Sequence, residues 1–165
     1  MEEKQLKVLA LNPSTTCNHK CGYCSSRQIF FKDSVVAKMI DFQDAQKLIV
    51  EAYQLGIKEL LLSGGDPLSH PQIIEIIKYA KKFSGLTIIM NSDIYNLEKQ
   101  CARDVIDAGL MVWNVSIDSM SNIVNDKLRG RTGALNNAKN TIDILNDLKI
   151  KESKNLIVNI LTVIN

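Results

Sequence analysis

The 165-residue sequence lacks the features that would place it in a membrane or in an export pathway. No stretch of uncharged apolar residues approaches the roughly 20 needed to span a bilayer. Its first ten residues, MEEKQLKVLA, contain no basic start, no long apolar run and no small-residue cleavage site, so we expect no signal peptide. We therefore expect a cytoplasmic protein, in which clustered cysteines are more often metal ligands or catalytic thiols than disulfides.

The chain also has little net charge and no linker or low-complexity tract. A formal charge of +2 does not indicate nucleic acid binding. Hydrophobic residues make up 45% of the chain and charged residues 23%, which are ordinary values for a globular protein. This length is typical of one domain with a sizeable core, which we place at residues 1–165.

Short apolar runs alternate along the chain with stretches that carry apolar residues at helical spacing. The runs are rich in β-branched residues and predict buried parallel strands, and Gly56, Gly85 and Gly109 stand where helices would stop. The predicted strands are 7–11, 57–62, 86–90, 110–117 and 156–164, and the predicted helices are 42–55, 72–83, 96–108 and 134–148. This order predicts an α/β fold with right-handed crossovers, in an open sheet or part of a barrel.

Polar or glycine-rich residues follow each of the first four predicted strands. Three cysteines come after the first strand, residues 63–67 after the second and residues 91–93 after the third, while Ser116 and Asp118 close the fourth. In parallel α/β proteins, ligands bind at the carboxyl ends of the strands, where these loops converge. The sequence therefore predicts one shared site.

The three cysteines, Cys17, Cys21 and Cys24, have the spacing C-x-x-x-C-x-x-C. Structural zinc sites and ordinary 4Fe-4S proteins use four protein ligands. Three thiolates on one short loop would leave one iron of a 4Fe-4S cluster without a protein ligand, and catalytic metals keep such an open position for a substrate.

This spacing resembles that of the radical S-adenosylmethionine (SAM) superfamily, whose members bind a 4Fe-4S cluster through three cysteines and chelate the fourth iron with SAM. In that family, an aromatic residue before the third cysteine contacts adenine, which corresponds to Tyr23. A Gly-Gly-Glu-Pro loop holds the amino group of SAM, and residues 64–67 are Gly-Gly-Asp-Pro, with an acid one methylene shorter. The resemblance implies SAM contacts at Tyr23, Gly64, Gly65, Asp66, Asn91, Ser116 and Asp118.

The stretches NVSIDSM and DKLRGRTGA look most like the molybdopterin-precursor cyclase and peptide-maturase branch. The resemblance implies a partial (βα) TIM-like barrel, with five of the usual six βα units present. It also implies reductive cleavage of SAM to a 5′-deoxyadenosyl radical, which abstracts hydrogen from a peptide or small-molecule precursor. A flavodoxin or ferredoxin would supply the electron. Because no sixth strand follows, we expect an incomplete core domain, or a partner that covers the open edge.

The alternative is a non-enzymatic iron-sulfur or zinc-binding module, built on the three cysteines with or without His19. We otherwise expect His19 to be an exposed loop residue and His70 to belong to the entry of a helix.

Cys101 lies on one stripe of the predicted third helix and is expected to be a buried structural thiol, and Trp113 is expected in the core. For Arg129 and Arg131, solvated loop positions and contacts to an anion both remain open.

Overall fold

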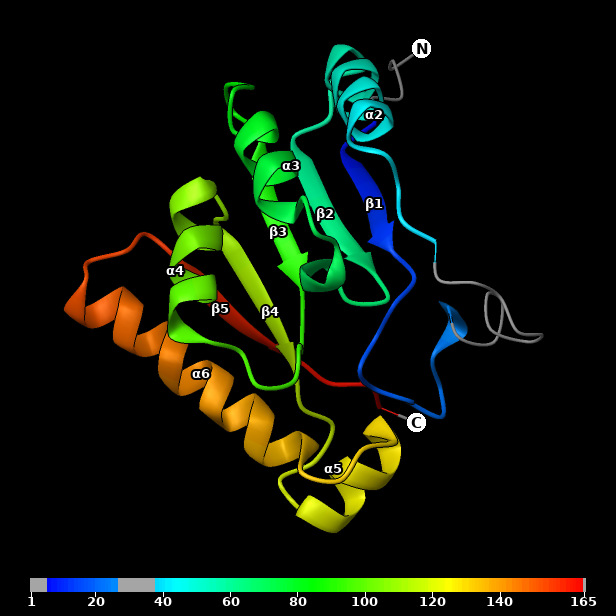
Figure 1. Cartoon of the computed structure of the whole chain (residues 1–165), viewed down its shortest axis with the longest axis vertical. Helices are drawn as coiled ribbons and strands as arrows, with labels where there is room; N and C mark the ends of the chain where they lie inside the picture. Colours follow the sequence, from blue (N-terminus) through cyan, green and yellow to red (C-terminus); the bar gives the residue numbers. More distant parts are fainter. Residues whose placement is uncertain (1–5, 27–37, 165) are drawn as a thin grey trace.

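The computed structural model describes residues 6–26 and 38–164, so positions 1–5, 27–37 and 165 of the expected domain lie outside the described residues. Five parallel strands form one sheet in the order β1-β2-β3-β4-β5 (Figure 1). The strands are β1 (Val8–Ser14), β2 (Glu59–Gly64), β3 (Thr87–Asn91), β4 (Val112–Ser116) and β5 (Ile157–Leu161). The helices are α2 (Phe42–Gln54), α3 (Ile73–Ala80), α4 (Lys99–Ala108), α5 (Asn122–Arg129) and α6 (Ala134–Lys151), with a 3-10 turn, η1 (Pro67–Ser69). The predicted alternation of strands and helices is confirmed.

Specific polar contacts set the starts of α2 and α4. The Asp41 carboxylate accepts from the Gln43 amide at 2.8 Å and caps α2. Helix α4 begins three residues later than predicted, because Asn96 has a left-handed φ of 59° and its amide donates to Asn137 Oδ1 at 2.8 Å. That backbone conformation excludes an α-helical turn at this position.

Helix α5 was not expected from the sequence, and its polarity runs opposite to the usual pattern. It buries Asn125 and Arg129, which are 0% and 8% exposed, while Ile123 is 83% exposed. Gly130 ends the helix in the left-handed conformation, with a φ of 62°. A search for apolar residues at helical spacing cannot find such a helix.

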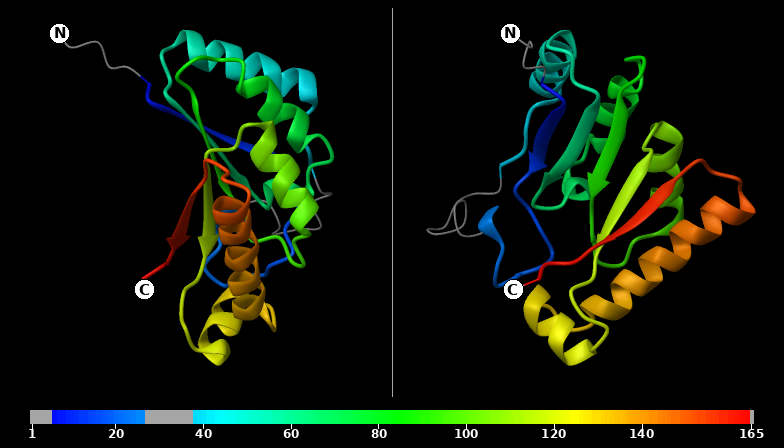
Figure 2. Two further views of the ribbon diagram at one scale, coloured as in Figure 1. Left: turned by 90° about the vertical axis from the view of Figure 1, so that its left-hand side faces the viewer. Right: turned by 180° about the vertical axis from the view of Figure 1, so that it is seen from behind.

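Helices α2, α3, α4 and α6 lie on the same face of the sheet (Figures 1 and 2). Alternate strand residues point into this layer, and Leu60, Ile88 and Trp113 are fully buried there. Trp113 therefore lies in the core as predicted, and its Nε1 donates to the Ser92 carbonyl at 3.1 Å. Cys101 on α4 packs against the same core but is only half-buried.

The opposite face of the sheet carries a row of asparagines. Asn91, Asn114 and Asn159 are register partners on β3, β4 and β5. The Asn114 amide donates to Asn91 Oδ1 at 2.8 Å, and the Asn159 amide donates to Asn114 Oδ1 at 3.0 Å. The row fixes the side chain of Asn91 at the carboxyl end of the sheet.

The outer edge of β5 pairs with no other strand within the described ranges. Its residues Ile157 and Ile160 are 54% and 58% exposed. Across the part of the chain that the structure covers, no helix is long and apolar enough to cross a membrane.

The central strand β3 provides a test of this core. We expect Ile88→Ala to lower the free energy of unfolding by about 2–5 kcal/mol, because it leaves a cavity beneath the helical layer. Urea denaturation measures the change. Ile123→Ala, at an exposed position of α5, is the control and should change stability by less than about 0.5 kcal/mol. Equal effects of the two substitutions would contradict the core assignment.

Candidate cofactor site

Two cavities of about 240 and 270 Å³ lie at the carboxyl end of the sheet and share part of their walls. The three thiols line both of them. The expected SAM residues Tyr23, Gly64, Gly65, Asp66, Asn91 and Ser116 each line at least one. Parallel topology thus brings together side chains from the ends of four strands.

The last turn of α5 holds the cysteine loop through two backbone hydrogen bonds. The Lys20 amide donates to the Arg129 carbonyl at 3.1 Å, and the Gly22 amide donates to the Leu128 carbonyl at 3.2 Å. These carbonyls belong to the last turn of a helix, where they have no partner within the helix. A Cβ on Gly130 would lie 2.1 Å from the Lys20 carbonyl oxygen, so only glycine allows this approach.

The glycine pair after β2 packs directly against the cysteine loop. The Gly65 amide donates to the Ser14 carbonyl at 2.8 Å, and the Asp66 amide donates to the Thr16 carbonyl at 2.7 Å. A Cβ on Gly65 would lie 2.3 Å from the Thr16 carbonyl oxygen. The close contact between these two loops therefore requires glycine, whatever contact the pair makes with a ligand.

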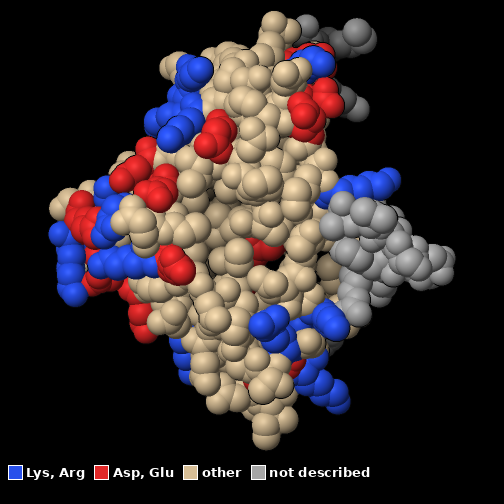
Figure 3. Space-filling model, in the orientation of Figure 1, with Lys and Arg blue, Asp and Glu red and all other residues tan. Residues whose placement is uncertain are grey.

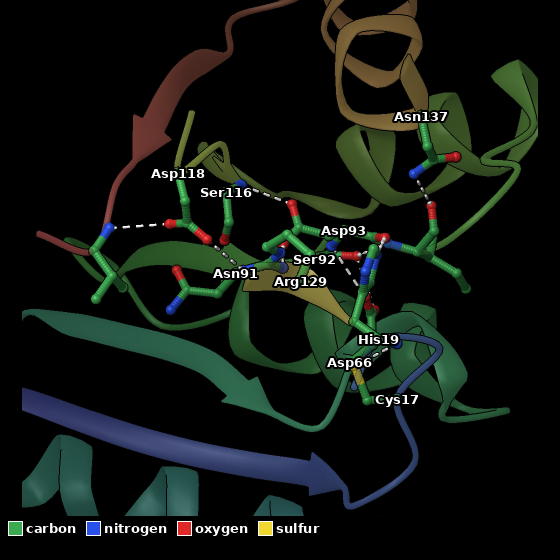
Figure 4. Close-up of polar contacts among 12 residues, drawn as sticks. Cys17, His19, Asp66, Asn91, Ser92, Asp93, Ser116, Asp118, Arg129 and Asn137 are labelled. Atoms are coloured by element: carbon green, nitrogen blue, oxygen red, sulfur yellow. Dashed lines mark hydrogen bonds and ion pairs between the residues drawn. The ribbon is translucent and has the colours of Figure 1, made fainter. Parts of the chain in front are cut away.

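The Asp66 carboxylate faces inward and accepts hydrogen bonds from neighbouring loops. Its donors are the Leu68 amide at 3.0 Å, the Ser92 hydroxyl at 2.8 Å and the Asp93 amide at 3.0 Å (Figure 4). Burial, together with the nearby Asp93 carboxylate, raises the pKa of Asp66 to about 6, although these hydrogen bonds oppose the shift. The SAM contact of Asp66 stays a prediction.

His19 is buried, at 7% exposure, so the expectation of an exposed loop residue was wrong. Its Nε2–H donates to the Asp93 carbonyl at 3.0 Å and ties the cysteine loop to the end of β3. Burial and the Arg129 charge lower the pKa of His19, which favours the neutral ring. His70 does belong to the entry of α3, because its Nδ1 accepts from the Gln72 amide at 3.1 Å.

Arg129 lies at the centre of a buried polar network (Figure 4). Its guanidinium pairs with Asp93 and donates to the Tyr23 hydroxyl at 3.0 Å, and it lies 4.0 Å from an Asp118 oxygen. Tyr23 in turn donates to Asp118. Burial and this bond raise the pKa of Tyr23. The Asp118 carboxylate is nearly inaccessible, so its contact with SAM stays a prediction.

The reading of Arg129 as a solvated loop charge is therefore wrong, because the residue ends a helix and is buried. Arg131 lies closer to solvent. Its guanidinium stacks on the Tyr95 ring at 3.8 Å from the centroid and donates to the Asn18 carbonyl at 2.9 Å.

Asp93 is the main residue that the sequence reasoning left out of the site. It accepts from the Ser116 amide at 2.7 Å, pairs with Arg129 and receives the His19 hydrogen bond at its carbonyl. In the sequence, only its position in the polar group after β3 indicated that Asp93 could belong to the site. The partners that give it importance lie in other loops.

The thiols are in a partly desolvated setting. Burial raises the pKa of Cys17 to about 11 and also raises that of Cys21, while Arg129 acts in the opposite direction on both. The thiolate is the form that binds iron, so a bound metal has to drive deprotonation. A nearby cation reduces the cost of doing so.

A sequence model of the Radical SAM superfamily matches residues 11–164. The chain belongs to this superfamily. Radical SAM proteins use a 4Fe-4S cluster and SAM, which agrees with the cofactors expected from the cysteine spacing. The match begins within β1 and extends past the end of β5.

Two curated radical SAM relatives are enzymes. GTP 3′,8-cyclase of Staphylococcus carnosus is 25% identical over 158 residues, which are 94% of this chain and 46% of the relative. AdoMet-dependent heme synthase of Methanosarcina barkeri is 28% identical over 139 residues, which are 84% of this chain and 39% of the relative. The chain thus spans less than half the length of either enzyme.

Among solved structures, SuiB of Streptococcus suis shares the fold. Its complex with the precursor peptide SuiA matches with a TM-score of 0.72 and 15% identity, over 96% of this chain and 33% of that chain. Its complex with SAM gives a TM-score of 0.69, also at 15% identity, over 93% and 32% of the two chains. These matches confirm the expected radical SAM type of α/β fold.

The residues at this site fit a 4Fe-4S cluster better than a single metal ion. No three His, Cys, Asp or Glu side chains among residues 6–26 and 38–164 gather as ligands of one ion. The cysteines of a four-iron cluster bind different irons and need not converge on one point. Three soft thiol ligands around one cavity suit this role.

The contact between Gly65 and the cysteine loop can be tested by substitution. We expect Gly65→Ala to destabilise the protein by about 1–3 kcal/mol, because the new methyl group overlaps the Thr16 carbonyl. Gly22→Ala, within the same cysteine loop, is the matched control, because its Cβ would meet nothing within 4 Å. Urea denaturation compares the two variants. Equal stability would show that the loops do not approach as closely as described.

The raised pKa of Asp66 predicts a pH dependence of stability. A folded-state pKa of about 6, above the ordinary value of 3.8, means that the folded protein holds this proton more tightly. The resulting stabilisation is complete below pH 3.8 and is lost as the pH rises through about 6. We expect Asp66→Asn to remove this part of the slope, which is at most about 1.4 kcal/mol per pH unit. Unfolding free energies from pH 4 to 7 measure it, and parallel profiles would contradict the shift.

Proposed function

We propose that the chain is the cofactor-binding core of a radical SAM enzyme. Cys17, Cys21 and Cys24 would hold three irons of a 4Fe-4S cluster, which would leave the fourth iron for the amino and carboxylate groups of SAM. The single observation that carries the proposal is the gathering of these thiols and of the expected SAM residues other than Asp118 around two cavities that share walls. When bound, the cluster supplies the electron that cleaves SAM.

The protein residues orient SAM and limit water. Tyr23 lies on the cavity wall, fixed by its bonds to Asp118 and Arg129, and its backbone would contact the adenine of SAM. Asn91, fixed by the row of asparagines, and Ser116 present polar groups to the same cavity. Gly64 and Gly65 leave backbone groups accessible to the methionine part of SAM.

The substrate we propose is a peptide or a small-molecule precursor, from which hydrogen is abstracted. SuiB, whose fold this chain shares, binds a precursor peptide, and GTP 3′,8-cyclase is a relative by sequence. A one-electron donor of the flavodoxin or ferredoxin class would reduce the cluster. Residues 1–165 would form one core domain, with the edge of β5 covered by further chain or by a partner.

The enzyme is tested by anaerobic reconstitution of the full chain with iron and sulfide. We expect about four irons per chain, the electron paramagnetic resonance signal of a reduced 4Fe-4S cluster, and formation of 5′-deoxyadenosine from SAM under reducing conditions. Alanine at Cys17, Cys21 or Cys24 should abolish cluster binding. Alanine at Cys101 is the matched control and should leave it intact, because this thiol packs against the core on α4.

The non-enzymatic alternative predicts a different outcome. A zinc or electron-transfer module would bind its metal, but SAM would neither change the cluster spectrum nor be cleaved. A cluster whose spectrum is indifferent to SAM would therefore support the module and reject the enzyme.

A further inference from the structure

The wall of the larger of the two cavities, of about 270 Å³, contains a buried ion pair. The side chains of Arg129 and Asp93 are 10% and 11% exposed, and both residues line this cavity together with the three thiols. Replacing a buried ion pair by packed apolar residues is often neutral or stabilising. Stability alone therefore does not explain why α5 turns a charge inward and leaves Ile123 outside.

Carboxylates outnumber cations in the group of charges around this ion pair. The Asp118 carboxylate also faces Arg129, at 4.0 Å, so one guanidinium meets two carboxylates and the net charge of the three groups is −1. The Tyr23 hydroxyl donates to Asp118, and the His19 Nε2–H donates to the Asp93 carbonyl. Within the described chain, Arg129 is the buried cation of this group, because Arg131 lies farther out on the Tyr95 ring.

Arg129 is also close enough to the thiols to act on them. It lines the same cavity as the three thiols, and its guanidinium donates to the hydroxyl of Tyr23, which directly precedes Cys24, at 3.0 Å. Its own backbone carbonyl accepts from the Lys20 amide in the cysteine loop at 3.1 Å, so the backbone of Arg129 is tied to that loop. Its guanidinium pairs with Asp93, and Asp93 in turn accepts from the Ser116 amide.

We propose that the Arg129 charge raises the reduction potential of the cluster held by Cys17, Cys21 and Cys24, and that the paired Asp93 carboxylate partly offsets this effect. This inference rests on the proposed function. When the cluster gains one electron, its negative charge increases by one. A fixed cation in a partly desolvated wall stabilises the reduced cluster more than the oxidised one.

The test is a potentiometric titration of the reconstituted full chain with dithionite and redox mediators, followed by electron paramagnetic resonance. We expect Arg129→Gln to shift the midpoint potential to a more negative value. Arg129→Lys, which keeps the positive charge, should have a potential close to that of the parent protein. Asp93→Asn, which removes a negative charge, should shift the potential in the positive direction. The double variant, in which both charges are absent, should lie between the two single variants.

Arg103→Gln is the matched control. Arg103 also pairs with a carboxylate, that of Glu152, through two bonds of 2.8 and 2.6 Å. This pair belongs to a network of ion pairs between α4 and the end of α6, and neither residue lines the two cavities. Basic and acidic side chains gather on the side of the molecule where these helices lie (Figure 3). Loss of this pair should leave the potential unchanged.

An Arg129→Gln protein with full iron content and the parent potential would overturn the proposal, as would equal shifts in Arg129→Gln and Arg103→Gln. If Arg129→Gln does not take up a cluster, the potential of Asp93→Asn is the test. A potential that does not rise in that variant would also reject the proposed effect of charge. A parent protein that binds no cluster rejects the proposed function itself, and the inference with it.

Discussion

The buried ion pair between Asp93 and Arg129 joins loops that the strands alone would leave separate. Asp93 follows β3 and accepts from the amide of Ser116 at the end of β4, while Arg129 ends α5, whose last carbonyls hold the cysteine loop. Breaking a buried pair by removing one partner typically costs about 3–5 kcal/mol, because the remaining charge is left uncompensated. The relative placement of the loops that form the site therefore depends on this contact.

Helix α5 illustrates how a functional site can override the usual rule for helix polarity. Burying Ile123 and Val124 would gain hydrophobic free energy, yet both are exposed while Asn125 and Arg129 are inside. The Asn125 side-chain Oδ1 accepts from the Asp118 amide at 2.9 Å and fixes the turn that leads into the helix. The polar side chains of α5 and the carbonyl groups of its last turn thus hold the loops that surround the cavity.

The glycines after β2 show that one short motif can satisfy two demands. The family resemblance assigns them to SAM, and the packing against the Thr16 carbonyl gives a separate reason why a side chain is excluded at Gly65. Asp66 has a similar structural role. Its carboxylate accepts three hydrogen bonds from the loops after β2 and β3, so it holds these loops together in the absence of a ligand.

The sequence alone determined the alternation of strands and helices, because burial imposes a period on apolar residues that can be counted. It also determined the cysteine triad and the polar strand ends, since parallel strands bring their carboxyl ends to one edge. Only the tertiary structure decided the positions of His19, Asp93 and Arg129. His19 and Arg129 meet Asp93 across 74 and 36 residues of sequence, and no local pattern encodes a partner at such a distance.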